Sequence, residues 1–139
     1  MKIEFIRILF DFGLLVLIWM VQLIIYPSFI FYEKADLIKW HQVYVKRISY
    51  VVIPLLFGQL LISLWQIYAF VSIYTIGSFA LIVCAWISTF TQFVPMHNQI
   101  SSTKFDTKLL QHLVHRNWLR TALWSSVFIW TALEVFIRA

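Results

Sequence analysis

Residues 48–103 read ISYVVIPLLFGQLLISLWQIYAFVSIYTIGSFALIVCAWISTFTQFVPMHNQISST and contain no Asp, Glu, Lys or Arg. As one helix this stretch would be about 84 Å long at 1.5 Å per residue, whereas the hydrocarbon core of a bilayer is only about 30 Å thick. The stretch must therefore fold back on itself. We expect the turn at the weak polar break Ser72–Tyr74, just before Gly77.

The composition of the chain is that of an integral membrane protein. Hydrophobic residues make up 62% and charged residues 12%, whereas soluble domains carry roughly 45–50% apolar and about 25% charged residues. The net charge of +5 would suggest nucleic acid in a soluble protein. Here the basic residues flank apolar segments, so membrane lipids and topology explain them, and no nucleic-acid partner is expected.

The chain is predicted to be an all-α, four-helix transmembrane bundle. At this length a single domain covering residues 1–139 is the natural expectation. The four helices are predicted at about residues 4–26, 37–70, 74–93 and 107–137.

Prolines and capping residues set these expected helix ends. Pro27 and Pro95 are expected to end the first and third helices, because a proline disfavours helical backbone in the residue before it. Asp36 is expected to cap the second helix, and Asp106 or Thr107 the fourth, because short polar side chains accept hydrogen bonds from the first free N–H groups.

The distribution of bases predicts the topology. Four spans place both termini and the second turn at one end of the bundle and the other two connections at the opposite end. Lys2, Arg7 and Arg138 lie at the terminal end, and every other Lys and Arg lies at the opposite end. The positive-inside rule then places the first and third connections in the cytoplasm and the termini outside, in a bacterial inner (plasma) membrane.

The fourth apolar segment, Thr121–Leu133, is too short to cross a bilayer alone. It spans only about 20 Å as a helix, so a crossing helix must draw in Arg120 or Glu134. Ionisable groups at membrane depth usually face a bundle interior or a wet cavity and mark function. The sequence therefore predicts a site near Arg120.

Helical phase predicts which polar groups face inward. At 100° per residue, a polar stripe runs down the otherwise apolar second helix and should face the bundle. The stripe comprises His41, Tyr44, Gln59, Ser63 and Gln66.

On the fourth helix, phases counted from Arg120 predict an inward set of His112, Arg116, Asn117 and Arg120. His115 and Trp118 fall on the opposite face by the same count.

The first helix carries ionisable groups as well. Arg7, Asp11 and Gln22 share one face, and the first and fourth helices bring Arg7 and Glu134 to the same leaflet. An Arg7–Glu134 or Asp11–Arg138 ion pair is therefore expected, acting as structural glue.

Two segments resemble a known family. They are FVPMHNQI at residues 93–100 and HRNWLRTALW at residues 115–124. Together with Tyr26-Pro27 and His41, they resemble small four-helix membrane proteins that include fungal anthrone oxygenases. The resemblance implies oxygenation of a polycyclic phenolic anthrone to an anthraquinone without a metal or flavin. The family positions it implies are Pro95, Asn98, Asn117, Trp118 and Arg120, with His41.

This chemistry needs a base to form an electron-rich carbanion and hydrogen-bond donors to hold the oxyanion that results. His41 or His97 is the predicted base, and Arg120 and Asn117 are the predicted donors. The full catalytic set is His41, His97, Asn98, Asn117 and Arg120. The predicted substrate-binding residues are Tyr44, Gln59, His112, Arg116 and Trp118.

Two other functions remain open from the sequence. One is a membrane redox protein that binds haem or copper, in which His41 pairs with His97 or His112. The other is a non-catalytic subunit or lipid-binding module. The expected partners are membrane lipids and a lipophilic small molecule, and the aromatic surface would also suit a homodimer.

Overall fold

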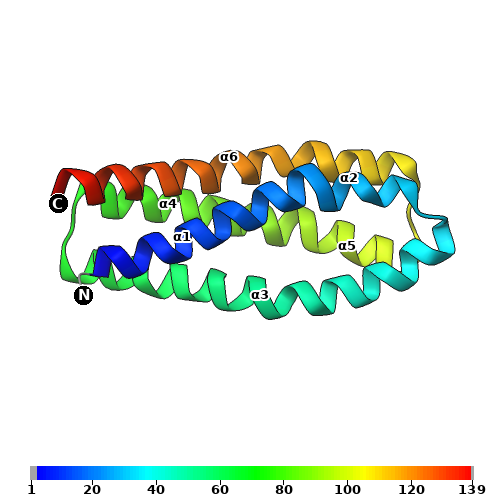
Figure 1. Ribbon diagram of the computed structural model, residues 1–139, viewed down its shortest axis with the longest axis horizontal. Helices are drawn as coiled ribbons and strands as arrows, with labels where there is room; N and C mark the ends of the chain where they lie inside the picture. The colour runs from blue at the N-terminus through cyan, green and yellow to red at the C-terminus, as the bar shows by residue number, and fades with distance from the viewer. Residues whose placement is uncertain (1–2, 139) are drawn as a thin grey trace.

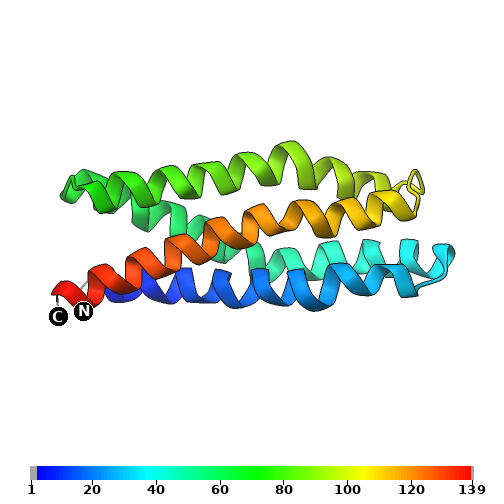
Figure 2. The same cartoon turned by 90° about the horizontal axis from the view of Figure 1, so that it is seen from above.

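The computed structural model describes residues 3–138, with side chains as far as residue 137. It is an all-α bundle of four long helical stretches that run antiparallel, and this part of the chain contains no strand (Figure 1). The two ends of the chain lie at the same end of the bundle (Figure 2). The predicted fold class is confirmed.

The first stretch combines α1, a π turn, a short α2 and a 3-10 turn, and the third stretch has a π turn in its middle. The elements are α1 (Ile3–Met20), η1 (Val21–Ile25), α2 (Tyr26–Ser28), η2 (Phe29–Phe31), α3 (Lys34–Ala69), α4 (Ile73–Ser88), η3 (Thr89–Phe93), α5 (Val94–Ser101) and α6 (Thr107–Arg138).

The helices form a closed ring in cross-section. α1 packs against α3 and α6, and α4 packs against the same two helices. The stretches Ile3–Phe31, Lys34–Ala69 and Ile73–Ser101 are long and apolar enough to cross a membrane. α6 falls outside that group, which agrees with the shortness of its apolar segment. The bundle is therefore built from three strongly apolar helices and one helix with a polar half.

Pro27 and Pro95 do not end their helices, so these two predictions are wrong. Each proline is the second residue after a π turn. In these turns the Tyr26 N–H bonds to the Val21 carbonyl, and the Val94 N–H bonds to the Thr89 carbonyl. A proline inside an α-helix lacks the donor N–H, and its ring clashes with the carbonyl four residues earlier. The wider π turn relieves that conflict, so the helical path continues.

The predicted starts of the other helices are partly confirmed. Asp106 caps α6, because its Oδ1 accepts the Leu109 N–H at 2.9 Å. α3 begins at Lys34, two residues before the predicted cap Asp36, which lies in its first turn; its N-cap residue is Glu33. Ser72 caps α4 with a reciprocal capping box to Thr75, at the predicted turn.

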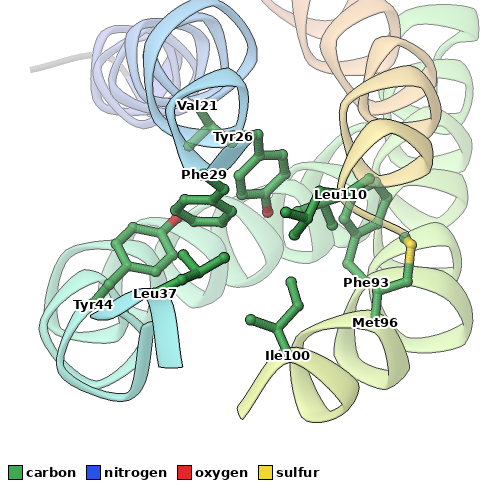
Figure 3. Packing of buried hydrophobic residues seen from close by; sticks show 10 residues of the cluster. Val21, Tyr26, Phe29, Leu37, Tyr44, Phe93, Met96, Ile100 and Leu110 are labelled. Carbon is green, nitrogen blue, oxygen red and sulfur yellow. The ribbon is translucent and has the colours of Figure 1, made fainter. Parts of the chain in front are cut away.

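Apolar side chains fill the end of the bundle that holds the α2–α3 and α5–α6 connections, called here the charged end. Figure 3 shows Tyr26 and Phe29 reaching into the bundle from one side, toward Phe93 and Ile100 on the other side. The cluster comprises Val21, Tyr26, Phe29, Leu37, Tyr44, Phe93, Met96, Ile100, Leu110 and Leu113.

The terminal half of the bundle holds a buried polar network around one ion pair. Arg7 Nε lies 3.0 Å from both carboxylate oxygens of Asp11, and both side chains are fully buried. Arg7 Nη1 also donates to Gln66, while Gln59 and Thr131 donate to Asp11 at 2.6 Å each. Buried charges are tolerated when they are paired and hydrogen-bonded in this way.

The expected partner of Arg7 is therefore wrong. The carboxylate that pairs with Arg7 is Asp11, one turn along the same helix, and not Glu134. The alternative Asp11–Arg138 pair involves a side chain outside the described residues. The shared face predicted for Arg7, Asp11 and Gln22 is confirmed, since all three are buried.

Candidate functional site

A cavity of about 240 Å³ lies inside the bundle between the polar network and the charged end. Aliphatic side chains make up about half of its lining, and most of them come from α1 and α3, such as Leu14, Ile18 and Val52. The polar side chains gather toward one end, where they come from α2, α3, α5 and α6. They include Tyr26, Tyr44, His97, Asn98 and Arg120.

The cavity reaches the lateral surface of the bundle between α3 and α5. Val45 and Ile53 of α3 line it and are 37% and 51% exposed, and Val94 of α5 lines it and is 41% exposed. Asn98 of α5 is exposed and Ser49 of α3 is half-buried, and both also line the cavity. A ligand passing between these helices would therefore cross a largely apolar surface that carries two polar side chains.

Two histidines form the centre of the polar end. His41 Nε2 lies 2.8 Å from His97 Nδ1, and the two rings are stacked with centroids 5.0 Å apart. His41 is fully buried behind His97, which lines the cavity. Phe29 packs edge-on against the His41 ring. The pair therefore presents one imidazole to the cavity and keeps the other in the core.

The outer nitrogen of each histidine in this pair is hydrogen-bonded to a hydroxyl group. Tyr26 Oη lies 2.8 Å from His97 Nε2, and Ser101 Oγ lies 2.9 Å from His41 Nδ1. Tyr26 lines the cavity, whereas Ser101 is half-buried at the last turn of α5. The four side chains form a continuous hydrogen-bonded chain from the cavity to the charged end.

Arg120 places a cation beside this chain. Its guanidinium carbon lies 4.0 Å from the centre of the Phe93 ring and 5.4 Å from that of Trp124. It is close enough to Tyr26 and His97 to act on them electrostatically. Its Nε is buried without a hydrogen-bond partner, and no carboxylate among the described side chains pairs with it. The cavity therefore contains a positive charge that no described acidic group neutralises.

Five of the residues predicted for the site meet around this end of the cavity. Tyr44, His97, Asn98 and Arg120 line it, and His41 supports His97 from behind. The polar stripe predicted for the second helix is also confirmed, because all five of its members are buried.

Two predicted site residues are buried but turn away from the cavity. Gln59 binds Asp11 and the Trp124 indole, so it belongs to the polar network. Asn117 donates to Gln22 at 2.9 Å and links α6 to α1. Their positions assign both to holding helices together rather than to contacting a ligand.

Three predicted substrate-binding residues lie on the exposed surface of α6. His112 and Arg116 contact each other at 3.1 Å, and Trp118 packs edge-on against Trp19. The inward assignment of His112 and Arg116 is wrong. The buried face of α6 follows Leu113, Asn117 and Trp124, about 40° around the helix from Arg120. Because the phase was counted from Arg120, the predicted inward face of α6 was rotated away from the face that is buried in the structure.

Tyr26, Ser101 and Trp124 belong to the site but were not among the predicted site residues. Ser101 lies one helical turn after His97, and this spacing indicates a shared face once α5 is known to be helical. The expected helix stop at Pro95 hid that relationship. Tyr26 lies one turn after the inward Gln22, but the expected end of the helix at Pro27 made it the last residue of the predicted helix.

The histidine-ligand alternative is only partly matched by the geometry. His41 and His97 come together, but the nitrogens that face each other are at hydrogen-bonding distance, and His112 is on the outside of α6. Among the described residues there is no group of three or more His, Cys, Asp or Glu side chains that could hold a metal ion.

Comparison of the chain with protein-family models, with curated proteins and with solved structures finds no match.

Proposed function

We propose that this protein is an integral membrane enzyme that binds a lipophilic aromatic molecule and removes a proton from it, as the first step of an oxygenation that needs no metal or flavin. The observation that carries the proposal is the presence of His97 and Arg120 at the same end of a largely apolar cavity. The histidine supplies a proton acceptor, and the arginine supplies a charge that stabilises the anion formed.

The size and opening of the cavity support a compact, membrane-dissolved substrate. Its volume of about 240 Å³ is slightly below the roughly 300–1,000 Å³ of pockets for drug-sized ligands. The lateral opening between α3 and α5 is lined by the apolar Val45, Ile53 and Val94, together with Ser49 and Asn98. The substrate class is therefore a small fused-ring ketone or phenol that partitions into lipid.

The proposed reaction converts an activated CH₂ group into a carbonyl. The hydrogen-bonded chain of Tyr26, His97, His41 and Ser101, called here the histidine chain, accepts a C–H proton. The electron pair left on carbon adds to dioxygen to form a peroxide. Loss of water from the peroxide leaves C=O, so that one dioxygen is consumed and one water is formed for each CH₂. Arg120 holds the substrate oxygen that shares the negative charge of the carbanion.

The proposal includes a placement in the membrane. The three apolar stretches cross the bilayer, with α6 completing the bundle, and the basic residues at the charged end face the cytoplasm. The histidine chain then lies toward the cytoplasmic surface.

Oxygen uptake by purified protein in lipid nanodiscs, with anthrone as probe, tests the proposal. We expect catalysed uptake of one dioxygen per anthrone converted to anthraquinone, and its loss in His97→Asn but not in the exposed-site variant His115→Asn. Failure of anthrone to bind or to react faster than without protein would contradict the proposal. A Soret band or near-stoichiometric copper would favour the histidine-ligand alternative instead.

A further inference from the structure

We propose that Tyr26, His97, His41 and Ser101 form a proton relay between the cavity and the surface of the charged end. This inference rests on the proposed function, because it specifies the route taken by the proton that the enzyme removes. It also assigns a role to Ser101, which does not line the cavity.

The relay follows from how the two imidazoles use their nitrogens. Both nitrogens of His41 and both of His97 have a partner within 2.9 Å. A neutral imidazole has one donor and one acceptor nitrogen. The donors of a chain of two such rings must therefore all point the same way, either toward Ser101 or toward Tyr26.

When all donors point toward Ser101, the relay can move a proton from the substrate to the surface. When the substrate proton reaches Tyr26 Oη, the Tyr26 hydroxyl proton passes to His97 Nε2. The His97 Nδ1 proton then passes to His41 Nε2, and the His41 Nδ1 proton to Ser101 Oγ, which releases its own to water. One proton enters, one leaves, and no electron moves along the chain.

After this transfer every hydrogen bond in the chain is reversed. The chain now donates toward the cavity, which is the direction needed to protonate the peroxide anion formed when the carbanion adds to dioxygen. That second transfer restores the starting arrangement. The relay therefore returns to its initial state once in each catalytic cycle, without ring rotation.

The packing around the four hydrogen-bonded side chains supports this route. Phe29 lies against the His41 ring, and Leu37 and Ile100 are buried in the surrounding cluster. His41 itself is fully buried, so its hydrogen-bonded neighbours provide its connection to solvent. Ser101 is half-buried and lies next to the turn that leads to α6.

Ser101→Ala tests the relay, with the exposed neighbour variant Ser102→Ala as matched control and Ser101→Thr as rescue. We expect Ser101→Ala to slow anthrone conversion by about a hundredfold, within the range for loss of a proton-transfer group. The dissociation constant of anthrone should change by less than about twofold, because Ser101 does not line the cavity. Ser101→Thr should restore most of the rate.

Nitrogen NMR of histidine-labelled protein provides a readout that does not need turnover. The wild type should show coupling across the hydrogen bond between His41 Nε2 and His97 Nδ1. In Ser101→Ala, His41 Nδ1 loses its acceptor, so the protons of both rings should settle on Nε2.

These readouts separate failure of the relay from failure of the proposed function. If wild-type protein does not convert anthrone, the proposed function fails and the NMR signals alone judge the relay. The relay is overturned if the coupling is absent, if the tautomers do not respond to Ser101→Ala, or if this variant converts anthrone at full rate. Loss of anthrone binding or of folding in Ser101→Ala would make Ser101 structural and would also overturn the relay.

Discussion

Tyr26 and His97 are 71 residues apart in sequence, yet their Oη and Nε2 atoms lie 2.8 Å apart inside the bundle. Tyr26 is the first residue after the π turn η1, and His97 lies in the first turn after the π turn η3. Two helices with the same local irregularity thus meet at the polar end of the cavity. π turns occur frequently at functional sites.

Replacing Tyr26 by Phe removes the hydroxyl between the cavity and His97 and leaves the ring in place. We expect anthrone conversion to fall by about ten- to a hundredfold with little change in binding, because proton transfer is lost. The melting temperature should fall slightly, since His97 Nε2 loses its partner. Rates and melting curves measured beside the exposed-site variant Tyr32→Phe check this, and an unchanged rate would remove Tyr26 from the chemistry.

Arg120→Gln tests the role of the cation with two ligands of similar size. We expect the affinity for 2-naphthoate, a stable anion, to fall at least tenfold, because a hydrogen bond to a charged group contributes about 1.5–3 kcal/mol. The affinity for uncharged naphthalene should stay the same. Arg116→Gln on the exposed face of α6 is the control, and titration by tryptophan fluorescence is the measurement. Equal losses for both ligands would show a packing defect instead.

Asp11→Ala is expected to destabilise the bundle without altering the site. It leaves Arg7 buried without its carboxylate, and breaking a buried ion pair costs about 3–5 kcal/mol. The melting temperature in detergent should drop well below that of Asp36→Ala, whose carboxylate is exposed in the first turn of α3. Anthrone binding measured well below the melting temperature should be retained. A near-normal melting temperature would mean that the network is not structural.

Gly77→Ala tests a close helix contact. A Cβ at Gly77 would overlap the Trp130 ring, whereas one at Gly13 would meet only the end of the Leu55 side chain at 3.0 Å. Overpacking costs about 1–3 kcal/mol, so Gly77→Ala should lower the melting temperature. Gly13→Ala should be close to neutral or stabilising, since alanine is more favourable than glycine in a helix by up to about 1 kcal/mol. The opposite order would contradict the packing described for α4 and α6.

The fold and one of its polar faces follow from the sequence because long uncharged segments leave few alternatives. The buried stripe through His41, Gln59 and Gln66 lies on α3, which is a single α-helix from Lys34 to Ala69. Its phase could be counted at 100° per residue along its whole length. The cap at Asp106 was equally local and equally predictable.

The rest of the site depends on features that regular periodicity does not contain. In an uninterrupted α-helix Tyr26 would lie about 100° around the axis from Arg7, yet both are buried. The π turn holds one extra residue and restores the shared face. His97 is brought into phase with the buried Ser78 of α4 in the same way. On α6 the error came from centring the face on Arg120, which lies at its edge.

The π turn at Val21–Ile25 has a consequence for sequence change: its extra residue and the proline that follows should be lost together. Leu23 is 59% exposed, so Leu23→Ala should be tolerated. Deleting Leu23 would leave 18 steps from Arg7 to Tyr26, which make about five full turns of a regular α-helix and keep both groups on one face. Pro27 would then lie inside that regular helix, where its ring clashes with the carbonyl four residues earlier. Chains of this architecture should therefore accept the deletion only when the proline is replaced as well.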